Sequence, residues 1–101
     1  MFDPLALGTA FEREHGATEA EWLQQLPGAV RDHALTLAPG EARVAIGTGE
    51  LHLQWQVLPP RQIALVRLPR LLVRYRFHDV PDDVRAPFLR YFFLFMQKGG
   101  G

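Results

Sequence analysis

The chain predicts a two-layer α+β fold, in which a four-stranded antiparallel meander packs one face against helices. Three observations predict it. Residues 50–57, "ELHLQWQV", alternate polar and apolar side chains, which is typical of a strand with one buried face. Both ends of the chain instead carry helix-start signals followed by apolar residues at helical spacing. Finally, 48% of the 101 residues are apolar, which is enough for one domain, residues 1–101, with its own core.

The first helix is predicted to begin after Thr18. Thr18 and Glu21 have the spacing of a capping box, and Trp22, Leu23 and Leu26 then share one apolar face. The Pro-Gly pair at 27–28 predicts the end of this helix or a bend, with a second short helix over 29–34 as an open alternative. The terminal segments 1–15 and 99–101 are expected to be flexible.

The strands follow from residue 41. A hairpin through the Gly-Thr-Gly turn at 47–49 would pair Ile46 with Leu51 and Val44 with Leu53. A loop at 58–61 and a turn at 69–70 would then add strands 63–68 and 71–77, placing Val66, Leu68, Leu71 and Val73 on the buried side. Because Pro-Arg is not a favoured hairpin turn, a bulge or a bend in one long strand stays open at 69–70.

The second helix is predicted from Asp79, Pro81 and the acidic pair at 82–83, which are typical of a helix start. Pro87 predicts a kink, or a later start near Ala86. The following apolar arc is wide, about 200° against the usual stripe of about 100°. It is either covered by the first helix and the sheet, or it forms an association surface, whose candidate residues are Tyr91, Phe93, Leu94 and Met96. Gly99 is predicted to cap this helix.

The polar face of the meander is the candidate binding surface. Four arginines and one acid, Glu50, are predicted there, with Ile63, Leu65 and Leu72 among them. Guanidinium groups suit phosphate or carboxylate, whereas the aliphatic side chains favour a protein partner or a dimer. The absence of an aromatic side chain disfavours base stacking on this face. The candidate binding residues are Arg43, His52, Gln54, Arg67, Arg74 and Arg76.

Several kinds of site are not indicated. The chain has no cysteine, and its four histidines show no metal-ligand spacing, so we predict no metal, no cofactor and no catalytic residue. Glu50 with His52, and His78 with Asp79, are spaced to form acid–base pairs, but solvated histidines of this kind are far commoner. No nucleotide-binding or hydrolase motif is present.

The charge distribution and the remaining composition set the expected function. Residues 1–50 carry eight acids and three bases, and residues 51–101 carry three acids and eight bases. The two halves either neutralise each other or mark an anionic partner for the second half. Without a signal-like N-terminus or an apolar run of about 18 residues, we expect a bacterial cytoplasmic protein with no membrane contact. The expected function is a non-enzymatic protein-interaction or self-associating module. The alternatives are anion or nucleic-acid binding by the arginines, and small-molecule binding between helix and sheet.

Overall fold

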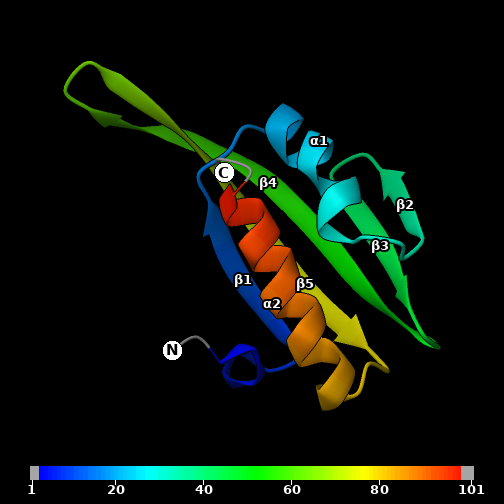
Figure 1. Cartoon of the computed structure of the whole chain (residues 1–101). Helices are drawn as coiled ribbons and strands as arrows, with labels where there is room; N and C mark the ends of the chain where they lie inside the picture. The colour runs from blue at the N-terminus through cyan, green and yellow to red at the C-terminus, as the bar shows by residue number, and fades with distance from the viewer. Residues whose placement is uncertain (1–2, 99–101) are drawn as a thin grey trace.

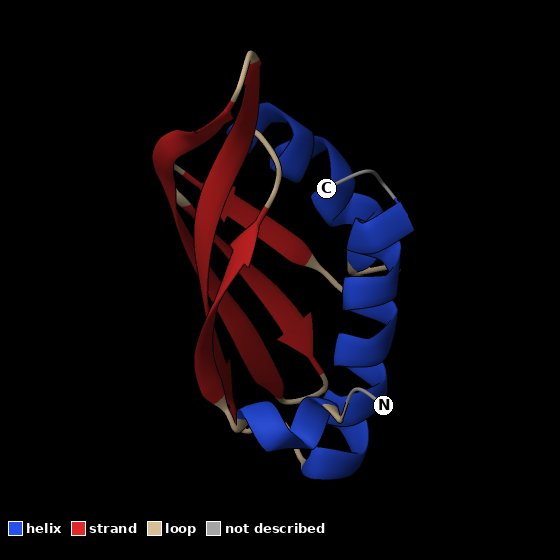
Figure 2. Cartoon of the chain, turned by 90° about the vertical axis from the view of Figure 1, so that its left-hand side faces the viewer, coloured by secondary structure: helices blue, strands red, loops and turns tan. Residues whose placement is uncertain are grey.

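The computed structural model describes residues 3–98 as one antiparallel sheet with helices on one face (Figures 1 and 2). The strand order is β1-β5-β4-β3-β2. The predicted α+β class, the antiparallel sheet and the C-terminal helix are confirmed. In chain order the elements are η1 (Pro4–Leu7), β1 (Ala10–His15), α1 (Glu19–Ala29), β2 (Leu35–Ala38), β3 (Glu41–Ile46), β4 (Gly49–Ile63), β5 (Val66–His78) and α2 (Asp82–Lys98).

The sheet has five strands, so the prediction of four strands was wrong. The edge strands β1 and β2 were missed, and part of the segment 1–15 that was expected to be flexible forms η1 and β1. In β1 the inward side chains are Phe11, Arg13 and His15, because these residues pair with the buried positions of β5. Because Arg13 and His15 are polar, the sequence of β1 does not show the polar–apolar alternation that is typical of a half-buried strand. The other edge strand, β2, has only four residues.

Strands β4 and β5 form a single long hairpin, so the two predicted turns at 58–61 and 69–70 were wrong. The hairpin turns at Ala64–Leu65, where Ile63 pairs with Val66. The ladder shifts register between Leu58 and Arg61, so two prolines on β4 oppose Pro69 on β5. Proline cannot donate to the ladder and is tolerated at such a bulge. Of the alternatives left open at 69–70, the structure shows one continuous strand.

The β3–β4 hairpin is two residues tighter than predicted. Val44 pairs with Leu51 and Ile46 pairs with Gly49. The turn uses Gly47 at φ 60°, a left-handed conformation that favours glycine. A shift of two residues leaves every side chain on the predicted face. Ten residues predicted on the buried side are buried: Ala42, Val44, Ile46, Leu51, Leu53, Trp55, Leu71, Val73, Tyr75 and Phe77. The same prediction was wrong for Val66 and Leu68, which are exposed on the other face because β5 runs on without the predicted turn.

Helix α1 begins with the predicted capping box. The Thr18 Oγ1 atom accepts from the Glu21 amide at 3.1 Å, and Glu21 Oε1 accepts from the Thr18 amide at 2.9 Å. The helix continues through Pro27 to Ala29, and residues 30–34 form turns rather than a second helix. Trp55 Nε1 donates to Glu19 Oε2 at 2.7 Å, which ties the helix start to the sheet.

Helix α2 begins at Asp82 and runs through Pro87, so a start near Ala86 was wrong. Its wide apolar arc is covered on two sides. The Phe92 ring contacts Trp22 of α1 and Tyr75 of β5, and the Phe93 ring contacts Phe11 of β1 and Tyr75. The predicted cap at Gly99 and the expected flexibility of residues 99–101 lie outside the described residues.

Candidate functional site

The end of the β4–β5 hairpin projects from the body as a hairpin arm, which we define as residues 57–70 (Figure 1, upper left). Strand β3 accompanies β4 only as far as Gln54, and β1 accompanies β5 only from Leu71 onward. Beyond these points the two strands of the arm pair only with each other. The long axis of the molecule accordingly reaches 46 Å, against 32 and 21 Å for the other two.

The arm turns through a residue with a left-handed backbone. Ala64 has φ 52°, as the tight two-residue turn between Ile63 and Val66 requires. Alanine in this conformation costs roughly 1–2 kcal/mol, which glycine would avoid. The Gln62 side chain donates to the Ala64 carbonyl at 3.1 Å and steadies the turn.

The arm exposes large aliphatic side chains. Leu65 at the tip is 97% exposed, and it is joined by Val57, Ile63, Val66 and Leu68. Alternation along β5 places Val66 and Leu68 on the face of the sheet opposite the helices, which we call the open face. Ile63 shares this face because it pairs with Val66. Contiguous exposed apolar surface of this kind is typical of an interaction site.

The arm is also purely cationic. No Asp or Glu occurs between residues 51 and 78. Arg70 bonds to Glu14 and to the Pro59 carbonyl at the base of the arm. Nearer the tip, neither Arg61 nor Arg67 forms a close ion pair within residues 3–98, and Arg61 acts on Glu14 only at longer range. Apolar side chains and cations without a close ion pair therefore occur together at the projecting end.

The open face of the body holds five of the six candidate binding residues, most of them in cross-strand pairs. Arg43 bonds to Glu50 at 2.5 Å, His52 to Glu41 at 3.0 Å, and Arg74 to Glu12 at 2.6 Å. Gln54 and Arg76 lie on the same face. The sixth residue, Arg67, lies on the opposite face of the arm, because β5 continues through the turn predicted at 69–70.

Three acids that the sequence analysis did not place on the open face are Glu12 and Glu14 of β1 and Glu41 of β3. With Glu50 they balance the arginines of the body, whereas four arginines with a single acid were predicted. The signal was hidden because β1 was not recognised as a strand. The arginines of these strands that form no close ion pair within the described chain are Arg61, Arg67 and Arg76.

The candidate interface on α2 is mostly used by the core. Phe93 and Met96 are buried, and Tyr91 is half-buried beneath the Arg31 guanidinium, 3.4 Å from its ring centroid. Only Leu94 of the four is well exposed, at 51%. The two helices and the sheet thus absorb most of the wide apolar arc.

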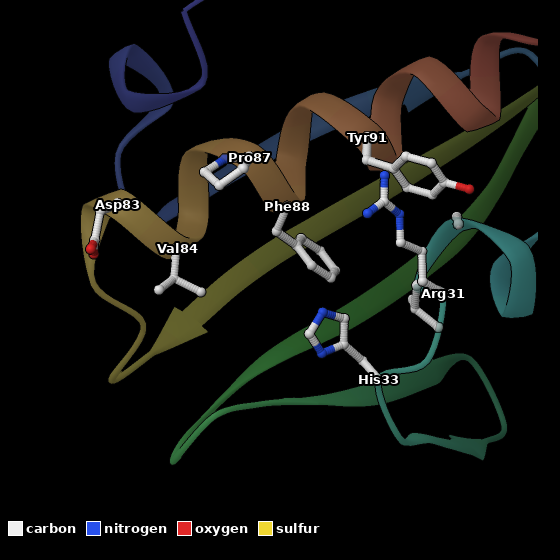
Figure 3. A pocket seen from close by; sticks show the side chains of 9 residues that line it. Arg31, His33, Asp83, Val84, Pro87, Phe88 and Tyr91 are labelled. Atoms are coloured by element: carbon white, nitrogen blue, oxygen red, sulfur yellow. The ribbon is translucent and has the colours of Figure 1, made fainter.

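A cavity of about 320 Å³ opens between α2 and the segment that follows α1 (Figure 3). Its apolar lining comes from Ala29, Val30, Val84, Pro87 and Phe88. His33 faces the Phe88 ring at 5.4 Å, Arg31 covers Tyr91, and Asp83 lies at the start of α2. This helix-side cavity is the place where the small-molecule alternative could apply, although it adjoins a turn rather than the sheet.

The cavity wall includes a strained residue. Arg31 has φ 57°, in the left-handed region that non-glycine residues rarely adopt. Its amide donates to the Gly28 carbonyl at 3.3 Å. Backbone strain of this kind is found at sites where geometry matters. Sequence reasoning missed this cavity because its residues come from two distant segments.

A buried polar pair lies inside the core, away from both surfaces. His15 Nε2 and the Tyr75 hydroxyl are 2.6 Å apart, beside the Trp22 ring. Burial, and to a lesser extent the Arg13 cation, lowers the pKa of His15 to about 4. Burial raises the pKa of Tyr75 well above its usual value. Both groups are therefore neutral near pH 7, and they act as structure rather than as exposed chemistry.

Two further features bear on function. Among the described residues, no three His, Asp or Glu side chains gather closely enough to hold a metal ion. Neither helix in the described part of the chain is sufficiently long and apolar to cross a lipid bilayer.

Comparison with protein-family models, with curated proteins and with solved structures finds no match to this chain.

Proposed function

We propose that this protein is a non-enzymatic interaction module, acting in the bacterial cytoplasm, whose binding element is the hairpin arm. The observation that supports this proposal is the exposure of Leu65 and its aliphatic neighbours on a projection with no body beneath it. Full burial of one such side chain stabilises a contact by roughly 1.5–3 kcal/mol. A tenfold change in affinity corresponds to about 1.4 kcal/mol, so burial of two or three such side chains raises the affinity by well over tenfold.

The bound partner is a protein, and self-association is the simplest form. The test compares Leu65→Asp with Leu94→Asp by sedimentation velocity over a wide range of concentrations. Leu94 is the matched control, because it is also an exposed leucine but lies on α2. We expect Leu65→Asp to abolish association and Leu94→Asp to leave it unchanged. Equal behaviour of the two variants would exclude the arm as the binding element.

Anion or nucleic-acid binding is the second candidate function. It is supported by the stretch without acids at residues 51–78 and by Arg61, Arg67 and Arg76, which form no close ion pair in the described chain. It is weakened by the cross-strand pairs that neutralise Arg43 and Arg74. It predicts oligonucleotide binding that falls steeply with added salt. Unchanged affinity after Arg61→Gln plus Arg67→Gln would remove this alternative.

A further inference from the structure

We infer that the partner of the arm is a second copy of this chain, and that the arm tip inserts into the helix-side cavity of that copy. This inference rests on the proposed function and adds the acceptor site. The arm and the cavity are two surfaces of one chain that match each other in apolar character and in charge.

The first match is apolar. The tip presents Leu65 between Ile63 and Val66, and the cavity presents Val84, Pro87 and Phe88. A cavity of 320 Å³ corresponds to about ten water molecules at about 30 Å³ each, which is room for a leucine side chain and part of a neighbour. A side chain at a projecting tip, such as Leu65, can reach into such an opening, whereas a flat surface cannot.

The second match is in charge. One acid, Asp83, lines the cavity at the start of α2, and Asp79 and Asp82 lie close to it in the sequence. Asp82 bonds to the buried Arg85 at 3.0 Å, and neither Asp79 nor Asp83 has an ion-pair partner within the described range. On the arm, Arg67 is two residues from Leu65, or roughly 7 Å along the strand. An inserted tip would therefore bring Arg67 to the level of the cavity rim, near the carboxylate of Asp83.

The other end of the cavity does not oppose this arrangement. The Arg31 cation is stacked on the Tyr91 ring, so it lies against the wall. The tip offers it no like charge, since residues 62–66 are uncharged.

The contact must form between two molecules. The arm leaves the body at the end near the C-terminal part of α2, and it points away from the beginning of α2 (Figure 1). The antiparallel ladder fixes that direction, so an arm cannot reach its own cavity. Donor and acceptor surfaces differ, which makes the contact heterologous. If two molecules each insert an arm into the other, the assembly is a closed dimer. If each molecule inserts its arm into a different neighbour, the contact repeats and forms a chain of molecules.

A mixing experiment with two variants tests the inference. Leu65→Asp disables the arm and keeps the cavity. Val84→Arg disables the cavity and keeps the arm, by placing a cation at an exposed helix position that lines it. We expect each variant alone to associate at least tenfold more weakly than the wild type. An equimolar mixture is expected to form a heterodimer, because one arm and one cavity are intact. Native mass spectrometry with the Val84→Arg protein labelled with ¹⁵N identifies that species by its mass.

The outcomes separate this inference from the proposed function. If Val84→Arg associates as the wild type does while Leu65→Asp does not, the arm binds elsewhere: the inference is overturned and the proposed function stands. The inference also fails if the mixture stays monomeric at the highest soluble concentration. A wild type that is monomeric throughout overturns the second copy as partner. Leu94→Arg alone is the control and should associate as the wild type does, because its arm and cavity are both intact. Circular dichroism confirms that each variant is folded.

Discussion

The imidazole of His15 and the hydroxyl of Tyr75 meet at 2.6 Å in the core, joining an edge strand to its neighbour. The imidazole is also packed beside Trp22, with 5.0 Å between ring centroids. No water-exposed surface is available to a charged imidazole there, since His15 is only 9% exposed. The free energy of unfolding is consequently expected to depend on pH through this pair.

Stability is expected to fall between pH 6.5 and pH 4. The pKa of His15 is lowered from 6.5 to about 4, so the unfolded chain binds a proton in this window and the folded chain does not. The stabilisation is complete above pH 6.5 and is lost as the pH falls, by roughly 3 kcal/mol below pH 4. Urea titrations at several pH values measure the slope. His15→Gln should flatten it, and an unchanged slope in that variant would assign the pH dependence to other groups.

Glycine positions should differ in their tolerance of alanine. A Cβ atom at Gly49 would collide with the main-chain carbonyls of His78 and Asp79, which cannot rotate away. At Gly28 it would meet the Phe95 ring, a half-buried side chain that can move. At Gly16 nothing lies within 4 Å. We expect Gly49→Ala to destabilise by about 1–3 kcal/mol, Gly28→Ala by less, and Gly16→Ala by almost nothing. Thermal unfolding of the three variants in a different order would contradict the close approach at Gly49.

The capping box of α1 should contribute measurably. Thr18→Ala removes the acceptor of the Glu21 amide and is expected to destabilise by about 1 kcal/mol. Thr48, exposed in the β3–β4 turn, provides the matched control. Chemical denaturation compares them, and equal midpoints for Thr18→Ala and Thr48→Ala would show that the cap is dispensable.

The arm should be dispensable for folding. Deleting residues 59–69 and joining Leu58 to Arg70 through Asn-Gly gives a short hairpin with a favoured turn. The deleted residues are not part of the buried core, so we expect the free energy of unfolding to change by less than about 1 kcal/mol. Association should be lost in the same protein. A loss of stability above about 2 kcal/mol would mean that the arm supports the body.

The face on which each strand residue of the body lies was predictable from sequence, because it depends only on the alternation of side chains along the strand. The β3–β4 register was wrong by two residues, yet Val44 and Leu51 lie on the predicted face because side chains alternate with period two. The capping box at Thr18 is a local contact, and it was predictable for that reason.

The predictions from sequence were wrong where the structure depends on the placement of prolines or on pairing between segments far apart in the chain. The prolines at 59–60 predict a turn, but in the structure a bulge accommodates them within β4. That error divided one long hairpin into three strands and hid the arm. The helix-side cavity joins Arg31 to Asp83, and no local pattern indicates such a meeting. The acids at Glu12 and Glu14 became relevant only when β1 was seen to pair with β5.

The hairpin arm ends in residues that no other part of its own body restrains. Residues 61–68 are all exposed and do not pack against the body. Substitutions at these positions can therefore accumulate without unfolding the protein. A few substitutions at the tip would alter partner choice while the sheet and helices stay the same. Relatives that share this body are accordingly expected to diverge fastest in the arm, and specificity could be transferred between them by exchanging that short segment.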